Sequence, residues 1–458
     1  MKRIFVFLLI FCFLITTSVQ SASAQGGNTY SAGFQVQNLE GSTANITLLF
    51  YDFNGNQVAS IPDTIPANSN KTYYPLTGVN PGFAGSVVVQ SDKKSASIVN
   101  LVIGNPIQGG GSYAGFNAPA NSVSLPLLMK ANFGIGTWFS VQNTTGAAMN
   151  VSVDYSGGGL GASQCDETVS VPAYSSKIFD QTTNSCLPNG WVGGAQLSAS
   201  GGLAAVVVQV KSGAPSVWAY SGFVTKDKIF YVPLFSTNYY RSGSSINVQN
   251  AGSSATNVTI TYTPNPGFPG NTCTETKTIN PGQTVVFGFP QLPAGCGSTS
   301  GFAGITDTTN GAFVGSAVVT SNSANQDLVA IVNQVKRGAN EGASYNAFYA
   351  SNATNKISFP LVMDRNYGLF TGMSIINVGS ANATVTCTFS GSSRTVTQTI
   401  APGAGFTDVH LNQFSSGYVG AAICTAGASD KIVGILNQAK SGAPDSQDQL
   451  FTYEGINY

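Results

Sequence analysis

The chain has 458 residues, of which only 8% are charged, and its 19 Lys and Arg balance its 19 Asp and Glu. An ordinary soluble domain carries about 25% charged residues. The composition excludes a nucleic-acid binder, which needs a surplus of Lys and Arg, and also a charged coiled coil or a highly charged disordered chain. A length of 458 residues predicts three or four domains.

The N-terminus is typical of a secretory signal peptide. Lys2 and Arg3 precede an apolar stretch, residues 4–15, which is too short to span a membrane stably. Residues 22–24, Ala-Ser-Ala, then match a cleavage site. We therefore expect a signal peptide over residues 1–24 and no integral membrane span after its removal.

Short sequence blocks recur in the same order four times along the rest of the chain, which identifies four internal repeats. The first block stands at Phe34-Gln-Val-Gln-Asn38, Phe139-Ser-Val-Gln-Asn143, Ile246-Asn-Val-Gln-Asn250 and Ser374-Ile-Ile-Asn377. The last block stands at Ile98-Val-Asn100, Val207-Val-Gln209, Ile331-Val-Asn-Gln334 and Ile435-Leu-Asn-Gln438. We place the repeats at residues 25–118, 119–225, 226–352 and 353–458.

Each repeat carries a β pattern throughout. Residues 45–51 and 257–262 are rich in β-forming residues, and turn formers such as Asn54-Gly55 separate such runs. Strands at intervals of roughly 8–12 residues fit a β-sandwich, and a repeat of this size can bury a core of its own. The predicted fold class is all-β: four tandem immunoglobulin-like β-sandwich domains, each independent, after a cleaved signal peptide.

Six of the seven cysteines lie beyond the signal peptide, two in each of the last three repeats. An even number of cysteines in an exported chain favours disulfides over a metal site, because no Cys-x-x-Cys pair is present. Six cysteines allow 15 connectivities, and the repeat symmetry favours pairing within each repeat. The expected pairs are Cys165 with Cys186, Cys273 with Cys296, and Cys387 with Cys424.

Catalytic, cofactor-binding and metal-binding constellations are not recognised. His410 is the only histidine, and its position in Asp408-Val-His410 favours a surface strand over a catalytic triad. Glu167 and Glu275 occupy equivalent places but show no partner pattern of the kind that glycosidases need. We therefore expect no enzyme, no cofactor and no metal ion.

Aromatic residues allow two interpretations. Phe83, Trp191, Phe313 and Tyr418 share one repeat position and are read as core packing. A second group is less regular, and its rings either fill the core, which is the favoured interpretation, or stack on sugars as ligand contacts. The residues of this group are Trp138, Trp218, Tyr239 and Tyr240.

An apolar-Pro-Leu segment precedes the last three repeats. The segments are Leu125-Pro-Leu127, Val232-Pro-Leu234 and Phe359-Pro-Leu361, whereas no such segment lies between Gln25 and Phe34. One terminal repeat is therefore expected to lack a strand, but the sequence does not indicate whether it is the first or the last. An open sheet edge accepts a strand from another chain, which favours head-to-tail association, although loops or Pro can equally well blunt the edge.

These blocks together resemble the tandem immunoglobulin- or fibronectin-like modules of secreted and cell-surface bacterial proteins. The resemblance implies adhesion, surface layers, filaments or matrix. We accordingly expect a secreted or cell-surface structural and adhesive protein, whose partners are other copies of itself or cell-surface components. The alternative is an extracellular carbohydrate-binding protein that uses surface aromatics to contact glycans.

Overall fold

A computed structural model describes residues 30–104, 107–161 and 163–458. Within these ranges the chain is almost entirely antiparallel β-structure, and its helical part is the short 3-10 element η2 (Ala350–Asn352). The described residues include no helix long and apolar enough to cross a membrane. The all-β class is therefore confirmed, while the predicted signal peptide lies outside the described residues.

The first two repeats contain the strands β1 to β14. Repeat 1 comprises β1 (Tyr30–Asn38), β2 (Ala44–Asp52), β3 (Gln57–Ile65), β4 (Asn70–Tyr73), β5 (Gly85–Ser91), β6 (Ser95–Ile103) and β7 (Gly109–Ala114). Repeat 2 comprises β8 (Ala120–Lys130), β9 (Ile135–Asn143), β10 (Met149–Ser156), β11 (Glu167–Val171), β12 (Ser176–Asp180), β13 (Trp191–Lys211) and β14 (Val217–Ser221).

The last two repeats contain β15 to β32. Repeat 3 comprises β15 (Ile229–Thr237), β16 (Ser242–Asn250), β17 (Thr256–Pro264), β18 (Cys273–Ile279), β19 (Thr284–Phe287), β20 (Phe313–Ser321), β21 (Leu328–Lys336), β22 (Gly342–Asn346) and β23 (Phe348–Tyr349). Repeat 4 comprises β24 (Lys356–Asp364), β25 (Leu369–Asn377), β26 (Ala383–Phe389), β27 (Thr395–Ile400), β28 (Gly405–Val409), β29 (Tyr418–Thr425), β30 (Ile432–Lys440), β31 (Leu450–Glu454) and β32 (Ile456–Asn457).

Repeats 1 and 4 each consist of two sheets, whereas the strands of repeat 2 and those of repeat 3 are each hydrogen-bonded into one continuous sheet. In repeat 4 the strand orders of the two sheets are β27-β26-β29-β24-β32 and β28-β25-β30-β31. Alternation along each strand explains the core: Ile46, Leu48 and Phe50 on β2 are buried, and they pack against Phe34 and Val36 of the opposite sheet. The same period of two recurs in the other repeats, because the β-branched runs recur.

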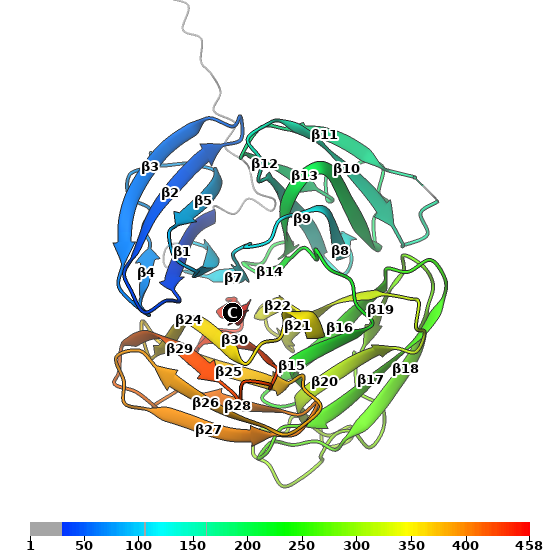
Figure 1. The fold of residues 1–458 in the computed structure, drawn as a ribbon. Coiled ribbons are helices and arrows are strands. Elements are labelled where there is room, and N and C mark those ends of the chain that lie inside the picture. Colours follow the sequence, from blue (N-terminus) through cyan, green and yellow to red (C-terminus); the bar gives the residue numbers. More distant parts are fainter. Residues whose placement is uncertain (1–29, 105–106, 162) are drawn as a thin grey trace, which may run out of the picture.

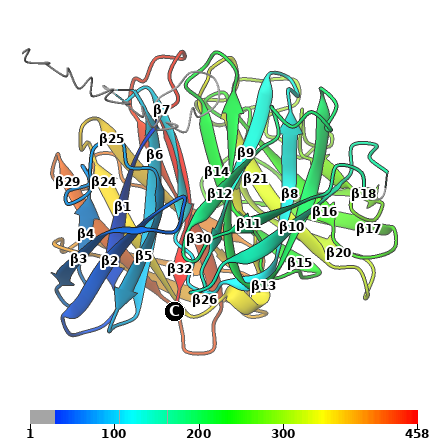
Figure 2. The same ribbon diagram turned by 90° about the horizontal axis from the view of Figure 1, so that it is seen from above.

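The four repeats surround one axis, so that the chain closes on itself (Figure 1). The last long strand of each repeat lies at the centre, and these axial strands, β7, β14, β22 and β31, contact one another in a cycle that includes β31 against β7. Figure 2, turned by 90°, shows the strands of all repeats running between two end faces of the ring. Repeats 1 and 4 are therefore neighbours although they lie at opposite ends of the sequence.

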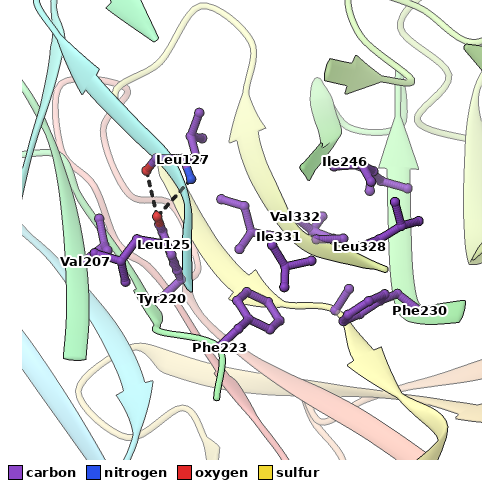
Figure 3. Close-up of a cluster of buried hydrophobic side chains, with 14 of the residues drawn as sticks. Leu125, Leu127, Val207, Tyr220, Phe223, Phe230, Ile246, Leu328, Ile331 and Val332 are labelled. Atoms are coloured by element: carbon purple, nitrogen blue, oxygen red, sulfur yellow. Dashed lines mark hydrogen bonds between the residues drawn. The ribbon is translucent and has the colours of Figure 1, made fainter. Parts of the chain in front are cut away.

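Neighbouring repeats share hydrophobic packing. At the contact of repeats 2 and 3, Leu125, Leu127 and Phe223 continue without a break into Phe230 and Ile331 of the next repeat (Figure 3). The rings of Phe223 and Phe230 meet edge to face with centroids 6.0 Å apart. The expectation that every repeat has a core of its own does not hold here, since one buried cluster spans the boundary at residues 225 and 226.

Apolar-Pro-Leu segments form the strands β8, β15 and β24, which we call the Pro-Leu strands. Each pairs with a strand of its own repeat and covers the face of the following repeat; β24 covers β1 of repeat 1 in this way. Repeat 1 has no such strand among the described residues, so it is the repeat that is short by one. The face that a head-to-tail filament would use on repeat 4 is covered by repeat 1 of the same chain.

We call the contacts between repeats junctions, and polar side chains form hydrogen bonds across junctions 2/3 and 3/4. At junction 2/3, Gln209 Nε2 donates to Asn333 Oδ1 at 3.1 Å and to Ser344 Oγ at 2.7 Å. At junction 3/4, Gln334 exchanges bonds with Asn437 and also reaches Thr452. The equivalent residues at junction 4/1 are Gln438, Asn100 and Ser112, whereas junction 1/2 has Leu101, Val208 and Ala219.

Three disulfides join the cysteine pairs that repeat symmetry predicts. Cys165 bonds Cys186, Cys273 bonds Cys296, and Cys387 bonds Cys424. Each bridge stays within one repeat; the last joins the paired strands β26 and β29. Closing loops of these lengths stabilises a chain by about 3 kcal/mol each in the chain-entropy picture.

Candidate functional site

Three turns present exposed aromatic rings. We call them the aromatic turns: residues 131–134, 238–241 and 365–368, each of which joins a Pro-Leu strand to the strand that follows. Phe133 is 94% exposed, Tyr240 is 63% exposed and Tyr367 is 90% exposed. These three residues occupy the same position of the turn in their repeats. Large apolar side chains with this exposure recur there although nothing in the core holds them.

The backbone of the aromatic turns disfavours aromatic residues. Phe133, Tyr240 and Tyr367 have φ of 49°, 48° and 50°, in the left-handed region where Gly, Asn and Asp are favoured. A bulky residue there costs about 1–2 kcal/mol. The Tyr240 ring packs against Tyr239 and Gly304, whereas Phe133 and Tyr367 are at least 90% exposed, so the recurrence of an aromatic residue here makes this position a candidate for binding.

The aromatic turns all lie at one end of the ring. Each is bonded to the axial loop of its repeat, the loop that leads into the axial strand: Ser212 N–H donates to Gly134 O, and Ser441 N–H donates to Gly368 O. The axial loops in turn bond to one another around the axis, for example from Asn340 N–H to Asp445 O at 2.8 Å. We call this end of the ring the loop end.

An open pocket of about 540 Å³ lies at the loop end, lined in part by the aromatic turn of repeat 3. Its lining combines Asn238 and Arg241 of the aromatic turn with Arg337 of the axial loop and with Thr306 and Asp307. Arg241 Nη1 is held by Asp445 Oδ2 at 2.8 Å. Hydrogen bonds from Asn310 hold the pKa of Asp307 below its ordinary value, so the pocket contains charges of both signs. The pocket is thus polar and close to neutral.

The four aromatic residues selected from the sequence have different environments. Tyr240 is exposed at the loop end, and Tyr239 lies half-buried beside it, with ring centroids 4.8 Å apart. Trp138 is partly buried against Tyr30 at junction 1/2.

Trp218 fits the favoured interpretation as a packed ring and not the ligand-contact alternative, because it is 7% exposed and its Nε1–H donates to Asp448 Oδ2 at 3.0 Å. Asp448 also accepts N–H bonds from Val217 and Gly342, so it joins three repeats at the axis. Burial raises the pKa of this carboxyl well above its ordinary value, although these N–H donors offset part of the effect. Trp218 therefore has a structural role.

Two aromatic residues of the turns, Phe133 and Tyr367, were not selected from the sequence. Asn132-Phe133 and Asn366-Tyr367 follow the Pro-Leu segments at the same interval, and this recurrence is the signal that identifies them. The shared Gly-aromatic position behaves as expected for packing in repeats 2 and 3, where Trp191 and Phe313 are buried.

His410 is buried, so the expectation of a surface-strand histidine is wrong. Its Nδ1 lies 2.6 Å from Thr371 Oγ1, and its Nε2 lies 3.2 Å from Asp408 Oδ2. Burial tends to raise the pKa of Asp408, but its contacts with His410 and Arg394 outweigh this and leave that pKa below its ordinary value.

The chain Thr371, His410 and Asp408 resembles a triad in order alone, because the Thr371 hydroxyl is buried and already bonded to the backbone of Met363. In repeat 2 the equivalent threonine, Thr137, bonds Gln181 Oε1 in the same way at 3.0 Å. His410 thus takes the place of a structural glutamine.

Clusters of three or more His, Cys, Asp or Glu that could hold a metal ion do not occur in the part of the chain that the structure describes. The search for relatives finds no protein-family model that matches the chain and no curated protein that matches it. The case for function therefore depends on the geometry of the loop end.

Proposed function

We propose that the protein is an extracellular adhesive protein that binds a neutral polysaccharide through the three aromatic turns. The observation that carries the proposal is the recurrence of an exposed aromatic ring at one left-handed turn position in three repeats. An aromatic face buries the apolar face of a sugar ring, while neighbouring polar groups satisfy its hydroxyls. The three disulfides are compatible with an extracellular location.

The charge balance supports a neutral ligand. The chain has no net charge at pH 7, and Arg241 in the lining of the loop-end pocket is paired with Asp445. A neutral chain of sugars needs stacking surfaces and hydrogen-bonding groups, and the loop end offers both.

The arrangement of the turns favours a repetitive ligand. Three equivalent contacts on one face of a closed ring bind a polymer with an avidity that exceeds a single contact by about 10²–10⁴. Each single turn is a small surface with little affinity of its own. Repetition on a rigid support is the feature that this proposal shares with the immunoglobulin- and fibronectin-like modules that the sequence resembles.

Binding of the mature chain to a glycan array and to insoluble polysaccharides, such as cellulose, chitin and xylan, tests the proposal. The informative variant combines Phe133→Asn, Tyr240→Asn and Tyr367→Asn, because Asn accepts the left-handed backbone and keeps the fold. We expect the wild-type chain to retain a neutral polysaccharide and the triple variant to bind it roughly 100-fold more weakly.

The matched control is Val58→Asn, which removes an apolar side chain of 48% exposure on β3, outside the aromatic turns. This variant should bind as the wild type does. Undiminished binding by the triple variant, or binding of charged polysaccharides alone, would contradict the proposal.

A further inference from the structure

One strand position of the ring is not filled by any described residue. The Pro-Leu strands β8, β15 and β24 each lie between a strand of their own repeat and the face of the next repeat. In the other repeats the Pro-Leu strand pairs with β13, β20 or β29, and the equivalent of these strands in repeat 1 is β5. Within the described ranges β5 pairs only with β2. The unfilled position lies between β5 of repeat 1 and β9 of repeat 2, and we call it the slot.

Residues of β5 show that the slot is open on the side of repeat 1. Val87 and Val89 are partly exposed. Their equivalents face a Pro-Leu strand in the other repeats, and each is at most 2% exposed: Ala195, Leu197, Ala317, Val319, Ala422 and Cys424. An unpaired strand edge with accessible apolar side chains is a site for strand addition.

Residues of repeat 2 show independently that the other wall is open as well. Ser140 and Gln142 on β9 are partly exposed. The equivalent residues of the other repeats, each covered by a Pro-Leu strand, are at most 6% exposed: Gln35, Gln37, Asn247, Gln249, Ser374 and Ile376. Val206, on the same face of repeat 2, is 9% exposed, more than Ile98, Ile331 or Ile435 at the same position.

We propose that the slot binds an extended segment of another polypeptide with the sequence apolar-x-apolar-Pro, which adds to β5 as an antiparallel strand. The three strands that fill the equivalent positions specify this chemistry: Val123-Ser-Leu125-Pro126, Phe230-Tyr-Val232-Pro233 and Ile357-Ser-Phe359-Pro360. In repeat 4, Ile357 stands opposite Cys424 and Phe359 opposite Ala422, which are the equivalents of Val89 and Val87.

Polar groups that bind the proline carbonyl elsewhere have counterparts in the slot. Pro360 O accepts bonds from Gln35 and Asn70, and Pro126 O accepts one from Thr284 Oγ1 at 2.6 Å. Ser140 and Ser176 occupy these places in repeat 2. Proline has no N–H, so an edge strand accommodates it there without losing a ladder bond.

The residues ahead of repeat 1 offer no such segment at the corresponding interval. In repeats 2 to 4 the proline stands thirteen residues before Phe139, Ile246 or Met373, but thirteen residues before Phe34 stands Ser21, with Ser18 and Gln20 in the apolar places. A folded second copy keeps its three Pro-Leu strands in its own sheets. The occupant is therefore a separate polypeptide.

A synthetic peptide with the sequence of Lys356–Asp364 tests the proposal on the mature chain. We expect saturable 1:1 binding in calorimetry, together with slower amide hydrogen exchange over Gly85–Ser91, because the peptide pairs with the free edge of β5. A control peptide with Ser in place of Ile357 and Phe359 keeps the backbone but loses the apolar contacts. It should bind roughly 100-fold more weakly.

A second variant keeps the test independent of the peptide's own behaviour. When residues Lys356–Asp364 are placed ahead of repeat 1 at the thirteen-residue interval, the chain fills its own slot and should no longer bind the peptide. Equal binding of both peptides, or protection outside β5, overturns the proposal. It is also overturned if β5 is protected without peptide through residues 25–29, or if the chain dimerises through β5 and excludes the peptide.

Discussion

Three equivalent positions are polar at junction 3/4 and apolar at junction 1/2. At junction 3/4, Gln334 Nε2 lies 3.2 Å from both Asn437 Oδ1 and Thr452 Oγ1, and Thr452 Oγ1 donates to Asn437 Oδ1 at 2.6 Å. At junction 1/2 the equivalent residues Leu101, Val208 and Ala219 are apolar, and they belong to one hydrophobic cluster. No junction mixes the two sets.

This all-or-none pattern has a physical cause. A buried amide that loses its partner costs about 1–3 kcal/mol, while replacing every partner by an apolar group of similar shape is close to neutral. The repeats of one chain therefore behave as a natural set of multiple mutants. Among the four junctions, the three positions are either all polar or all apolar.

Junction 4/1 carries the polar set although its halves lie far apart in the sequence. Repeat 4 has Gln438 and repeat 1 has Asn100 and Ser112 at the equivalent positions, and Ser112 Oγ donates to Asn100 Oδ1 at 2.6 Å, while Gln438 Nε2 is buried without a hydrogen-bond partner among the described residues. The two halves of this junction are brought together by the contact of β31 with β7. The distribution of Gln, Asn and Ser along the chain is thus itself an argument for the closed ring.

The largest effect is expected when one polar residue enters the apolar junction. Val208→Asn places an amide in a fully buried position among Leu101 and Ala219, where it finds no partner. We expect the free energy of unfolding to fall by about 3 kcal/mol, measured by urea denaturation. Adding Leu101→Gln and Ala219→Ser to this variant should restore most of the loss. If Val208→Asn leaves the free energy of unfolding unchanged, an unpaired polar residue at junction 1/2 has no cost and the argument from matched junction residues is wrong.

A smaller loss is expected when one member leaves the polar junction. Gln334→Leu removes the partner of the Asn437 amide and leaves that partly buried amide without this bond. The expected loss is about 2 kcal/mol in the same urea titration. Ser60→Ala on β3, outside the junctions, serves as the control and should leave the midpoint unchanged. If Gln334→Leu also leaves it unchanged, the bonds of junction 3/4 carry no net stability.

Much of the fold follows from local patterns in the sequence, and the ring does not. Strands, turns and disulfide pairs are encoded within about one hundred residues, where β alternation and repeat symmetry specify them. Ring closure depends on outward-facing residues such as Gln209 and Asn333. Their sequence pattern is that of an ordinary solvent-exposed polar face of a strand. Their role becomes visible only when two repeats are placed side by side.

Part of the candidate site follows from the sequence for the same reason. Tyr240 was selected because it stands out in the sequence, while Phe133 and Tyr367 require knowledge that all three turns reach one end of the ring. His410 is buried although a surface strand was expected, because a strand does not reveal from its sequence which face its neighbours cover. Exposure is set by long-range contacts, and local patterns do not contain them.

The residues at the ends of the axial strands also differ between repeats, and one of them, Glu454, makes stability depend on pH. Repeats 2 to 4 end in Ser221, Asn346 and Glu454, whereas repeat 1 ends in Ala114. Glu454 Oε1 accepts the Asn346 N–H at 2.6 Å. Burial raises the pKa of Glu454 above its ordinary value of 4.5, and N–H groups of Asn346 and Ala114 offset part of this.

A raised pKa means that the folded chain prefers the protonated carboxyl. Below pH of about 4 Glu454 is protonated in both states, and as the pH rises the unfolded chain ionises first, so stability is lost until the folded pKa is reached. Glu454→Gln removes this loss. We expect the variant to gain about 1 kcal/mol relative to wild type between pH 4 and pH 7 in urea titrations. A difference that does not change with pH contradicts the assignment.

The smallest effect is expected from the exchange of a whole junction. Gln334→Leu, Asn437→Val and Thr452→Ala together turn junction 3/4 into a copy of junction 1/2, with no amide left unpaired. We expect the free energy of unfolding to stay within about 1 kcal/mol of wild type, although one of the three changes alone costs about twice as much. The three single variants measured beside the triple variant give the coupling directly. Independent contributions would make the triple variant the least stable of all, and the polar and apolar junctions would then not be interchangeable. A triple variant near wild type shows instead that a junction is stabilised by consistency among its members, whichever chemistry they share.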